Sequence, residues 1–209
     1  MNKILMDGDK LFLEECYDKI EVHGSSIIFI KDLDNFKLEI NVLDNSTLYI
    51  YDFSTKNVDK EITIKQNNNT KVGYVHTFKI EGDYKLKYRA YINGNNNSNE
   101  VYISGVSKGS VFLDVDGTVK KQTVLNSLNE SIKVLTTNGK CFVSPILHVS
   151  SLDVIANHNT AISNIREDEL FYLLSKGISK ESAVALIEDG YVYGYMKKYS
   201  EEFYNYIKC

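Results

Sequence analysis

The sequence has a single proline, no tryptophan and three cysteines among its 209 residues, and only two of its cations are arginines. The cysteines, at positions 16, 141 and 209, are too few and too far apart for a disulfide framework or a Cys-x-x-Cys metal or redox site. Lysine and arginine total 24 against 28 acidic residues, a net charge of −4. This composition lacks the positive surface of a dedicated nucleic-acid-binding protein, so we expect no nucleic acid partner.

Long apolar segments are also missing. Uninterrupted apolar runs such as Ile27–Ile30 are far shorter than the ~20 residues that cross a membrane. Asp7 and Asp9 follow the N-terminal Met1–Met6 at once, so no apolar core of a signal peptide can form there. The sequence therefore predicts a cytoplasmic protein with reduced thiols and no membrane partner.

Asparagine is abundant, with 20 residues, and it gathers in polar stretches that separate short alternating segments. Apolar and polar side chains alternate with a period of two in Phe36–Val42 and Tyr84–Ala90, which is typical of strands. Residues 67–69 and 93–97 have the composition of turns. A chain with one proline can keep its strand hydrogen bonds uninterrupted. These patterns predict a mainly β body but leave open whether the strands form hairpins or a parallel solenoid.

The spacing of apolar residues changes near residue 165, from the period of two that is typical of strands. Apolar residues then recur with helical spacing in three stretches, 170–174, 183–187 and 192–206, and we expect one helix in each. Ser179 is the expected N-cap of the second helix. We therefore predict a β core over residues 1–164 and a C-terminal helical segment over residues 165–209. The helical stripes are too small to form a core alone, so they must pack on the body or on another protein.

One motif suggests phosphoryl transfer. The segment from Asp114 to Thr118 reads Asp-x-Asp-Gly-Thr after an apolar run, and it resembles the signature of haloacid-dehalogenase phosphohydrolases. In that chemistry Asp114 would be the nucleophile and Asp116 the general acid/base, with Mg²⁺ between them. The same chemistry needs alternating strands and helices, which the downstream sequence does not predict. The simpler interpretation is a strand that turns at Asp116-Gly117, and a Mg²⁺-dependent phosphohydrolase stays the alternative.

A second set of motifs lies between residues 139 and 195. In order, they are Pro145-Ile146-Leu147, Asp153-Val154, His158-Asn159-Thr160-Ala161, Leu170 to Gly177, Ala183 to Ile187, and Gly190-Tyr191. Taken alone, His158 between two asparagines is typical of a surface turn, and one histidine is weak evidence for a metal site. Taken together, the order and spacing of these motifs resemble the core of the SufB/SufD family, scaffold proteins of the Suf iron–sulfur cluster assembly machinery.

The resemblance implies a mainly β fold, a right-handed parallel β-helix followed by a small C-terminal α-helical segment. It also implies a SufD-like, non-enzymatic scaffold that dimerises through the β-helix with a SufB-like partner or a second copy. A SufC-type ATPase would dock on the C-terminal helices. The residues that would contact it are Leu170, Phe171, Tyr172, Leu173 and Gly177.

No cofactor is expected to stay bound, although an iron–sulfur cluster would form transiently within a complex. The sequence has no Gly-x-x-x-x-Gly-Lys-Ser/Thr loop, so any nucleotide would belong to the partner. A β-solenoid interaction module that works outside cluster assembly is the remaining alternative.

This chain departs from the SufB-type pattern at three positions. Such members are proposed to use a cysteine before the proline and glutamates beside the histidine, where this chain has Gly139, Asn157 and Asn159. Asparagine is a poor iron ligand compared with carboxylate or thiolate. His158, shared with SufD-type members, is therefore the candidate metal or interface residue. Cys141 lies two residues after Gly139, hence on the same face of a strand, and is a weaker candidate.

Overall fold

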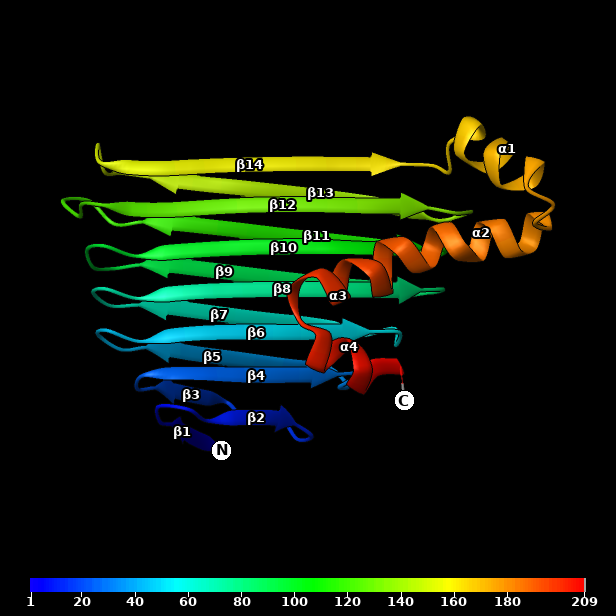
Figure 1. Ribbon diagram of the computed structural model, residues 1–209. Coiled ribbons are helices and arrows are strands. Elements are labelled where there is room, and N and C mark those ends of the chain that lie inside the picture. The colour runs from blue at the N-terminus through cyan, green and yellow to red at the C-terminus, as the bar shows by residue number, and fades with distance from the viewer. Residues whose placement is uncertain (209) are drawn as a thin grey trace.

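Two parallel β-sheets make up most of the structure, a computed structural model that describes residues 1–208 (Figure 1). The odd sheet contains β1 (Asn2–Leu5), β3 (Lys19–Val22), β5 (Phe36–Val42), β7 (Asp59–Gln66), β9 (Asp83–Ile92), β11 (Ser110–Val119) and β13 (Lys140–Val149). The even sheet contains β2 (Lys10–Leu13), β4 (Ser25–Lys31), β6 (Thr47–Ser54), β8 (Lys71–Ile80), β10 (Ser98–Ser107), β12 (Asn126–Thr136) and β14 (Val154–Ser163). Consecutive strands alternate between the sheets, and each pairs in parallel with the strand two before it. The predicted parallel β-solenoid is confirmed, and the strands do not form hairpins.

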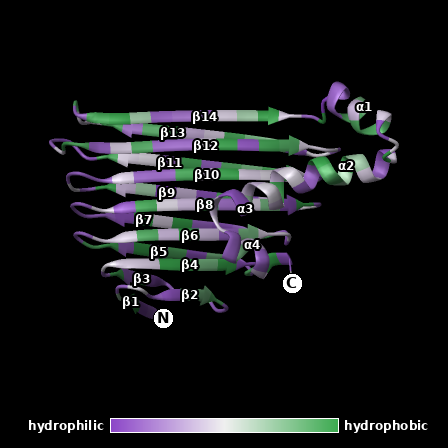
Figure 2. Cartoon of the chain, viewed as in Figure 1, coloured by the Kyte–Doolittle hydropathy of each residue, from purple (hydrophilic) through white to green (hydrophobic). Residues whose placement is uncertain are grey.

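The core lies between the two sheets because alternate side chains of every strand point inward. In the odd sheet, for example, Ile62, Tyr88 and Val115 are in register on three neighbouring strands, and all three are fully buried. Burying side chains of this size stabilises the fold by roughly 1.5–3 kcal/mol each. Figure 2 shows the resulting alternation of hydrophobic and hydrophilic residues along the strands. The period-two pattern of the sequence thus becomes a continuous stack of apolar side chains.

A polar network interrupts this apolar stack in the middle of the solenoid. The ammonium group of Lys60 lies 2.7 Å from Asp52 Oδ1, and neither side chain is exposed. Tyr74 donates a hydrogen bond to Asp52 Oδ2 at 2.9 Å, and His76 Nδ1 lies 3.2 Å from the same oxygen. Burial alone would raise the pKa of Asp52, but the charge of Lys60 and hydrogen bonds from Lys60 and His76 hold it well below its usual range. The carboxylate therefore stays ionised inside the solenoid.

The abundant asparagines stack at the turns. Asn45, Asn69 and Asn96 occupy equivalent turns in successive rungs, with φ angles of 61°, 56° and 54°. Asparagine tolerates this left-handed conformation better than most residues. The side-chain amide of Asn69 donates to Asn45 Oδ1 at 3.1 Å, and that of Asn96 donates to Asn69 Oδ1 at 3.1 Å. The asparagine ladder thus ties one rung to the next along one edge of the solenoid.

The C-terminal segment is helical and covers the outer face of the even sheet (Figure 1). It contains α1 (Glu167–Ser175), α2 (Lys180–Asp189), the π-helical turn η1 (Gly190–Gly194), α3 (Tyr195–Tyr199) and α4 (Glu201–Lys208). The Ser179 side chain caps α2 as expected, accepting a hydrogen bond from the Ser182 amide at 3.2 Å. The expectation of one helix over residues 192–206 is wrong, because Ser200 is extended and separates α3 from α4. Its hydroxyl accepts a hydrogen bond from the Phe203 amide at 3.1 Å, which starts the new helix.

The helical segment packs on the body, one of the two options that its small apolar stripes left open. A shared apolar cluster joins Phe29, Phe53, Val75, Val106 and Leu135 of the even sheet to Ile187, Val192, Met196, Phe203 and Ile207 of the helices. Glu188 of α2 is 2% exposed and lies 2.9 Å from the ammonium groups of both Lys79 and Lys108. Apolar burial and a buried ion-pair cluster therefore hold the helices in place. None of the helices in residues 1–208 has the length and apolarity needed to cross a membrane.

Candidate functional site

The last two strands, β13 and β14, carry both candidate metal residues and form an open end of the solenoid (Figure 1). Within residues 1–208, β13 pairs only with β11, and β14 pairs only with β12. Ile162 of β14 is 46% exposed, although its in-register neighbour Val134 on β12 is fully buried. The inward-facing side chains of the last rung are therefore uncovered on one side.

His158 faces inward at this open end. It is in register with Glu130 of β12, which is buried between the inward-facing Leu128 and Ile132. Because paired residues of parallel strands project to the same side, His158 also points toward the space between the sheets. Its imidazole is nevertheless exposed, since no further strand in the described residues covers the rung. The structure thus places the candidate histidine where a second molecule could reach it.

Glu130 is a residue that the sequence interpretation missed. Its side chain is 3% exposed, and neither carboxyl oxygen has a hydrogen-bond partner among residues 1–208. Burial, helped by the nearby charge of Asp116, raises the pKa of Glu130 to about 8, so the carboxyl is largely neutral at pH 7. One signal was available in the sequence, namely an acidic residue at an inward position of an alternating strand.

Cys141 does not lie beside His158. It faces inward on β13 and packs against the apolar core. Across the core, Leu128 of β12 lies against Gly117 of β11. Their partners one rung later are Ala156 of β14 and Leu147 of β13. Because β13 and β14 run in opposite directions, Pro145, two residues before Leu147, lies opposite His158, two residues after Ala156. Cys141 is four residues from Pro145, a separation of about 13 Å along the strand. Burial also raises the pKa of its thiol to about 12, so the reactive thiolate is scarce at neutral pH.

Asp114 and Asp116 lie within β11, on the outer face of the odd sheet. The guanidinium of Arg89 forms an ion pair with Asp114 and lies 3.9 Å from Asp116. The expected turn at Asp116-Gly117 is wrong: Gly117 faces the core, where an added Cβ would lie 2.2 Å from Leu128 Cδ2. The solenoid lacks the alternating strands and helices of the phosphohydrolases. Across residues 1–208, no three His, Cys, Asp or Glu side chains are grouped to hold a metal ion. The structure therefore does not support the phosphohydrolase alternative.

The expected partner-binding residues lie on α1 and at its end. Phe171 and Tyr172 are 72% and 60% exposed, and α1 has no buried residue. Leu170 and Leu173 are half-buried. Gly177, with a φ angle of +80°, ends the helical turn in open space. An exposed aromatic pair on a helix that packs loosely is an unusual surface for an isolated domain.

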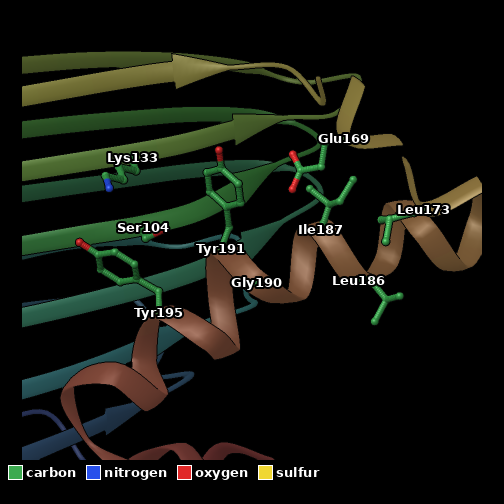
Figure 3. A pocket seen from close by; sticks show the side chains of 9 residues that line it. All are labelled: Ser104, Lys133, Glu169, Leu173, Leu186, Ile187, Gly190, Tyr191 and Tyr195. Atoms are coloured by element: carbon green, nitrogen blue, oxygen red, sulfur yellow. The ribbon is translucent and has the colours of Figure 1, made fainter. Parts of the chain in front are cut away.

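A cavity of about 630 Å³ lies beside these residues, between the helices and the even sheet (Figure 3). Leu173 of α1 and Leu186 of α2 line one part of it, and the rings of Tyr191 and Tyr195 line another. Figure 3 shows both tyrosines between the helical segment and the strands. The α1 residues that line this largely apolar groove are Glu169 and Leu173, whereas Phe171 and Tyr172 lie outside it.

Comparison with known proteins agrees with the motif order. The family model described as SUF system FeS cluster assembly, SufBD core domain, matches residues 37–191. The iron–sulfur cluster assembly protein SufD of Bacillus subtilis is 23% identical over 160 residues, which cover 75% of this chain and 33% of that protein. A SufBD family protein of Mycobacterium bovis is 25% identical over 101 residues, 46% of this chain and 12% of that protein. One from Pyrococcus horikoshii is 46% identical over 52 residues, 25% of this chain and 12% of that protein.

The chain spans about a third of the Bacillus subtilis relative and about an eighth of the other two. The family model nevertheless covers most of the chain, from β5 to the start of η1. The resemblance expected from the motifs at Pro145 and His158 is therefore confirmed. The chain belongs to the SufBD family of iron–sulfur cluster assembly proteins.

Proposed function

We propose that the chain is a SufD-like scaffold component of iron–sulfur cluster assembly rather than an enzyme. One observation carries this proposal: His158, which faces into the solenoid, is left uncovered by the open last rung. A scaffold needs such a residue at a surface that a second chain can close. Any cluster formed there is cargo rather than a resident cofactor, and cytoplasmic assembly is consistent with the free thiols of Cys16 and Cys141.

Dimerisation through the open end follows from the chemistry of its edges. β13 and β14 each present a ten-residue edge whose backbone groups are unpaired on one side within the described residues. Such long edges are ready templates for strand pairing with another chain. Exposed apolar residues at this end, Ile155 at 66% and Ile162 at 46%, add to the surface that a partner would bury. The proposed occupant is a SufB-like chain or a second copy of this chain.

The helical segment is the proposed docking site for a SufC-like ATPase. Phe171 and Tyr172 would be the aromatic anchors, and Leu173 and Leu186 line the adjoining groove. Aromatic side chains that enter a concave apolar surface often dominate the binding energy of an interface. The ATPase would supply the nucleotide chemistry that this chain lacks.

Capture of a purified SufC-like ATPase tests the proposal directly. The exposed double variant Phe171→Ala/Tyr172→Ala should keep the wild-type melting temperature and lose most of the captured ATPase. Tyr91→Ala is the matched control, because this half-exposed aromatic lies on the odd sheet, away from the helices. Equal capture by the wild type and the double variant would refute the docking site. Failure of the wild type to capture the ATPase would instead favour a solenoid module that works outside cluster assembly.

A further inference from the structure

Glu130 needs an explanation that the fold alone does not provide. A buried carboxyl is normally paired, because a group without a partner loses its hydration and gains nothing in return. Neither oxygen of Glu130 has a hydrogen-bond partner among residues 1–208. The contact between Gly117 and Leu128 sets which residues of β11 and β12 face each other, and it places the apolar Val115 opposite Glu130. The unsatisfied carboxyl lies one rung below the open end.

His158 is the nearest neighbour of Glu130 in the direction of the open end. The two residues are in register on adjacent parallel strands, about 4.8 Å apart, and both point inward. Pro145, which lies opposite His158, contributes no polar side-chain group. An ion that enters from the open end would therefore meet the exposed imidazole first, with the buried carboxyl of Glu130 on the neighbouring strand beneath it.

Neighbouring polar groups do not converge on the same point. Asn157 faces the outer side of the sheet, where its amide donates to Asn129 Oδ1 at 3.0 Å. Asn159 shares that outward direction, because adjacent residues of a strand point to opposite faces. The thiol of Cys141 lies about four residues away along the opposing strand. Among the His, Cys, Asp and Glu side chains of the described residues, Glu130 and His158 are thus the two that face inward in register on β12 and β14.

We propose that Glu130 and His158 form a half-site for a divalent transition-metal ion, ferrous iron in the proposed function, which a second copy of this chain docked on the open end completes. The Glu130 carboxyl releases its proton to solvent when a metal binds, and one carboxylate and one imidazole then suit ferrous iron, zinc and cobalt(II). Two protein ligands are fewer than the four of a closed tetrahedral site, so the site is incomplete in one chain. This inference rests on the proposed scaffold function and adds Glu130 to its site.

The test combines metal binding with oligomeric state. Cobalt(II), and ferrous iron under anaerobic conditions, are titrated into the purified chain by calorimetry, and the mass is measured by light scattering with and without metal. The wild type should bind the metal and increase in mass when it is added. Glu130→Gln, which keeps the volume of the side chain, and His158→Ala should each lower the affinity at least about tenfold. Both variants should also abolish the mass increase.

His148→Ala is the matched control, because this histidine lies on the same end rung but faces the outer side of the odd sheet and is 61% exposed. It should bind metal as the wild type does. Wild-type binding by Glu130→Gln would overturn the half-site, as would the absence of metal binding by the wild type. If the half-site fails while the wild type still captures the SufC-like ATPase, the scaffold proposal stands. If the wild type binds metal but does not capture the ATPase, the half-site stands and the proposed ATPase docking fails.

Discussion

Phe203 of α4 stacks on Phe29 of β4, with ring centroids 5.2 Å apart and ring planes 11° apart. The contact joins residues that are far apart in the sequence, and both side chains are almost fully buried. In the same region, Lys10 of β2 forms an ion pair with Glu202 at 2.7 Å. The C-terminal helices therefore hold early rungs of the solenoid as well as late ones.

We expect Phe203→Ala to lower the free energy of unfolding by about 3–5 kcal/mol, because it removes a buried ring and leaves a cavity against Phe29. Chemical denaturation followed by circular dichroism measures the change. Tyr91→Ala, at a half-exposed position on the opposite sheet, is the control and should cost less. A loss below about 1 kcal/mol for Phe203→Ala would show that the helical segment contributes little to stability.

Glu188 should make the docking of α2 sensitive to acid. Burial would raise its pKa, but hydrogen bonds and charges from Lys79 and Lys108 lower it below the model-compound value of 4.5. A carboxyl whose pKa is lower in the folded than in the unfolded protein stabilises the fold at pH values above the unfolded-state pKa. This stabilisation is lost as the pH falls through the folded-state pKa. Glu188→Gln should therefore be less stable than the wild type at pH 7, by up to about 3–5 kcal/mol.

The difference between the two proteins should shrink as the pH falls from 5 toward 3. Thermal unfolding at several pH values measures it, with the exposed Glu181→Gln as the control. Equal stability of Glu188→Gln and the wild type at pH 7 would contradict the assigned role of the buried ion-pair cluster.

The pair of Lys60 and Asp52 should behave as one unit. Lys60→Met leaves the Asp52 carboxylate buried without its main counter-charge, which should cost about 3–5 kcal/mol. Adding Asp52→Leu should recover part of that loss, because a pair of apolar residues needs no charge compensation, while the buried hydroxyl of Tyr74 loses its acceptor. A double-mutant cycle by urea denaturation measures the coupling, and additive effects of the two changes would count against it.

Gly117→Ala should destabilise the solenoid by about 1–3 kcal/mol, because the new methyl group would overlap the side chain of Leu128. Combining it with Leu128→Ala should be less harmful than the sum of the two single changes, since the smaller residue makes room. Denaturation midpoints of the three variants measure this. A neutral Gly117→Ala would mean that Leu128 repacks freely.

The sequence predicted the strands well, because inward and outward side chains alternate in every rung. It could not choose between hairpins and a coil, since the period of two is the same in both. The order of motifs from Pro145 to Tyr191 decided that question. The break at Ser200 was missed because apolar residues keep their helical spacing across it, although a serine followed by Glu201 and Glu202 is a typical helix start.

The candidate site was predicted only in part. His158 was proposed because it belongs to a recognisable string of residues. Glu130 was not found, because its proximity to His158 depends on the pairing of β12 with β14, which a linear sequence does not show. Asp116-Gly117 was misread for a related reason: the dipeptide is typical of turns, whereas the packing of Leu128 across the sheets determines its conformation.

The contact between Phe29 and Phe203 has a consequence for the order of synthesis. Translation runs from the N-terminus, so the rungs of the solenoid can pair one after another as they leave the ribosome. The outer face of the even sheet, with Phe29 and Phe53, nevertheless stays uncovered until the helices that follow β14 have been made. A nascent chain with its rungs already stacked therefore exposes an apolar strip until α2, α3 and α4 have emerged. Chaperones that bind such strips would act on this protein until α4 emerges.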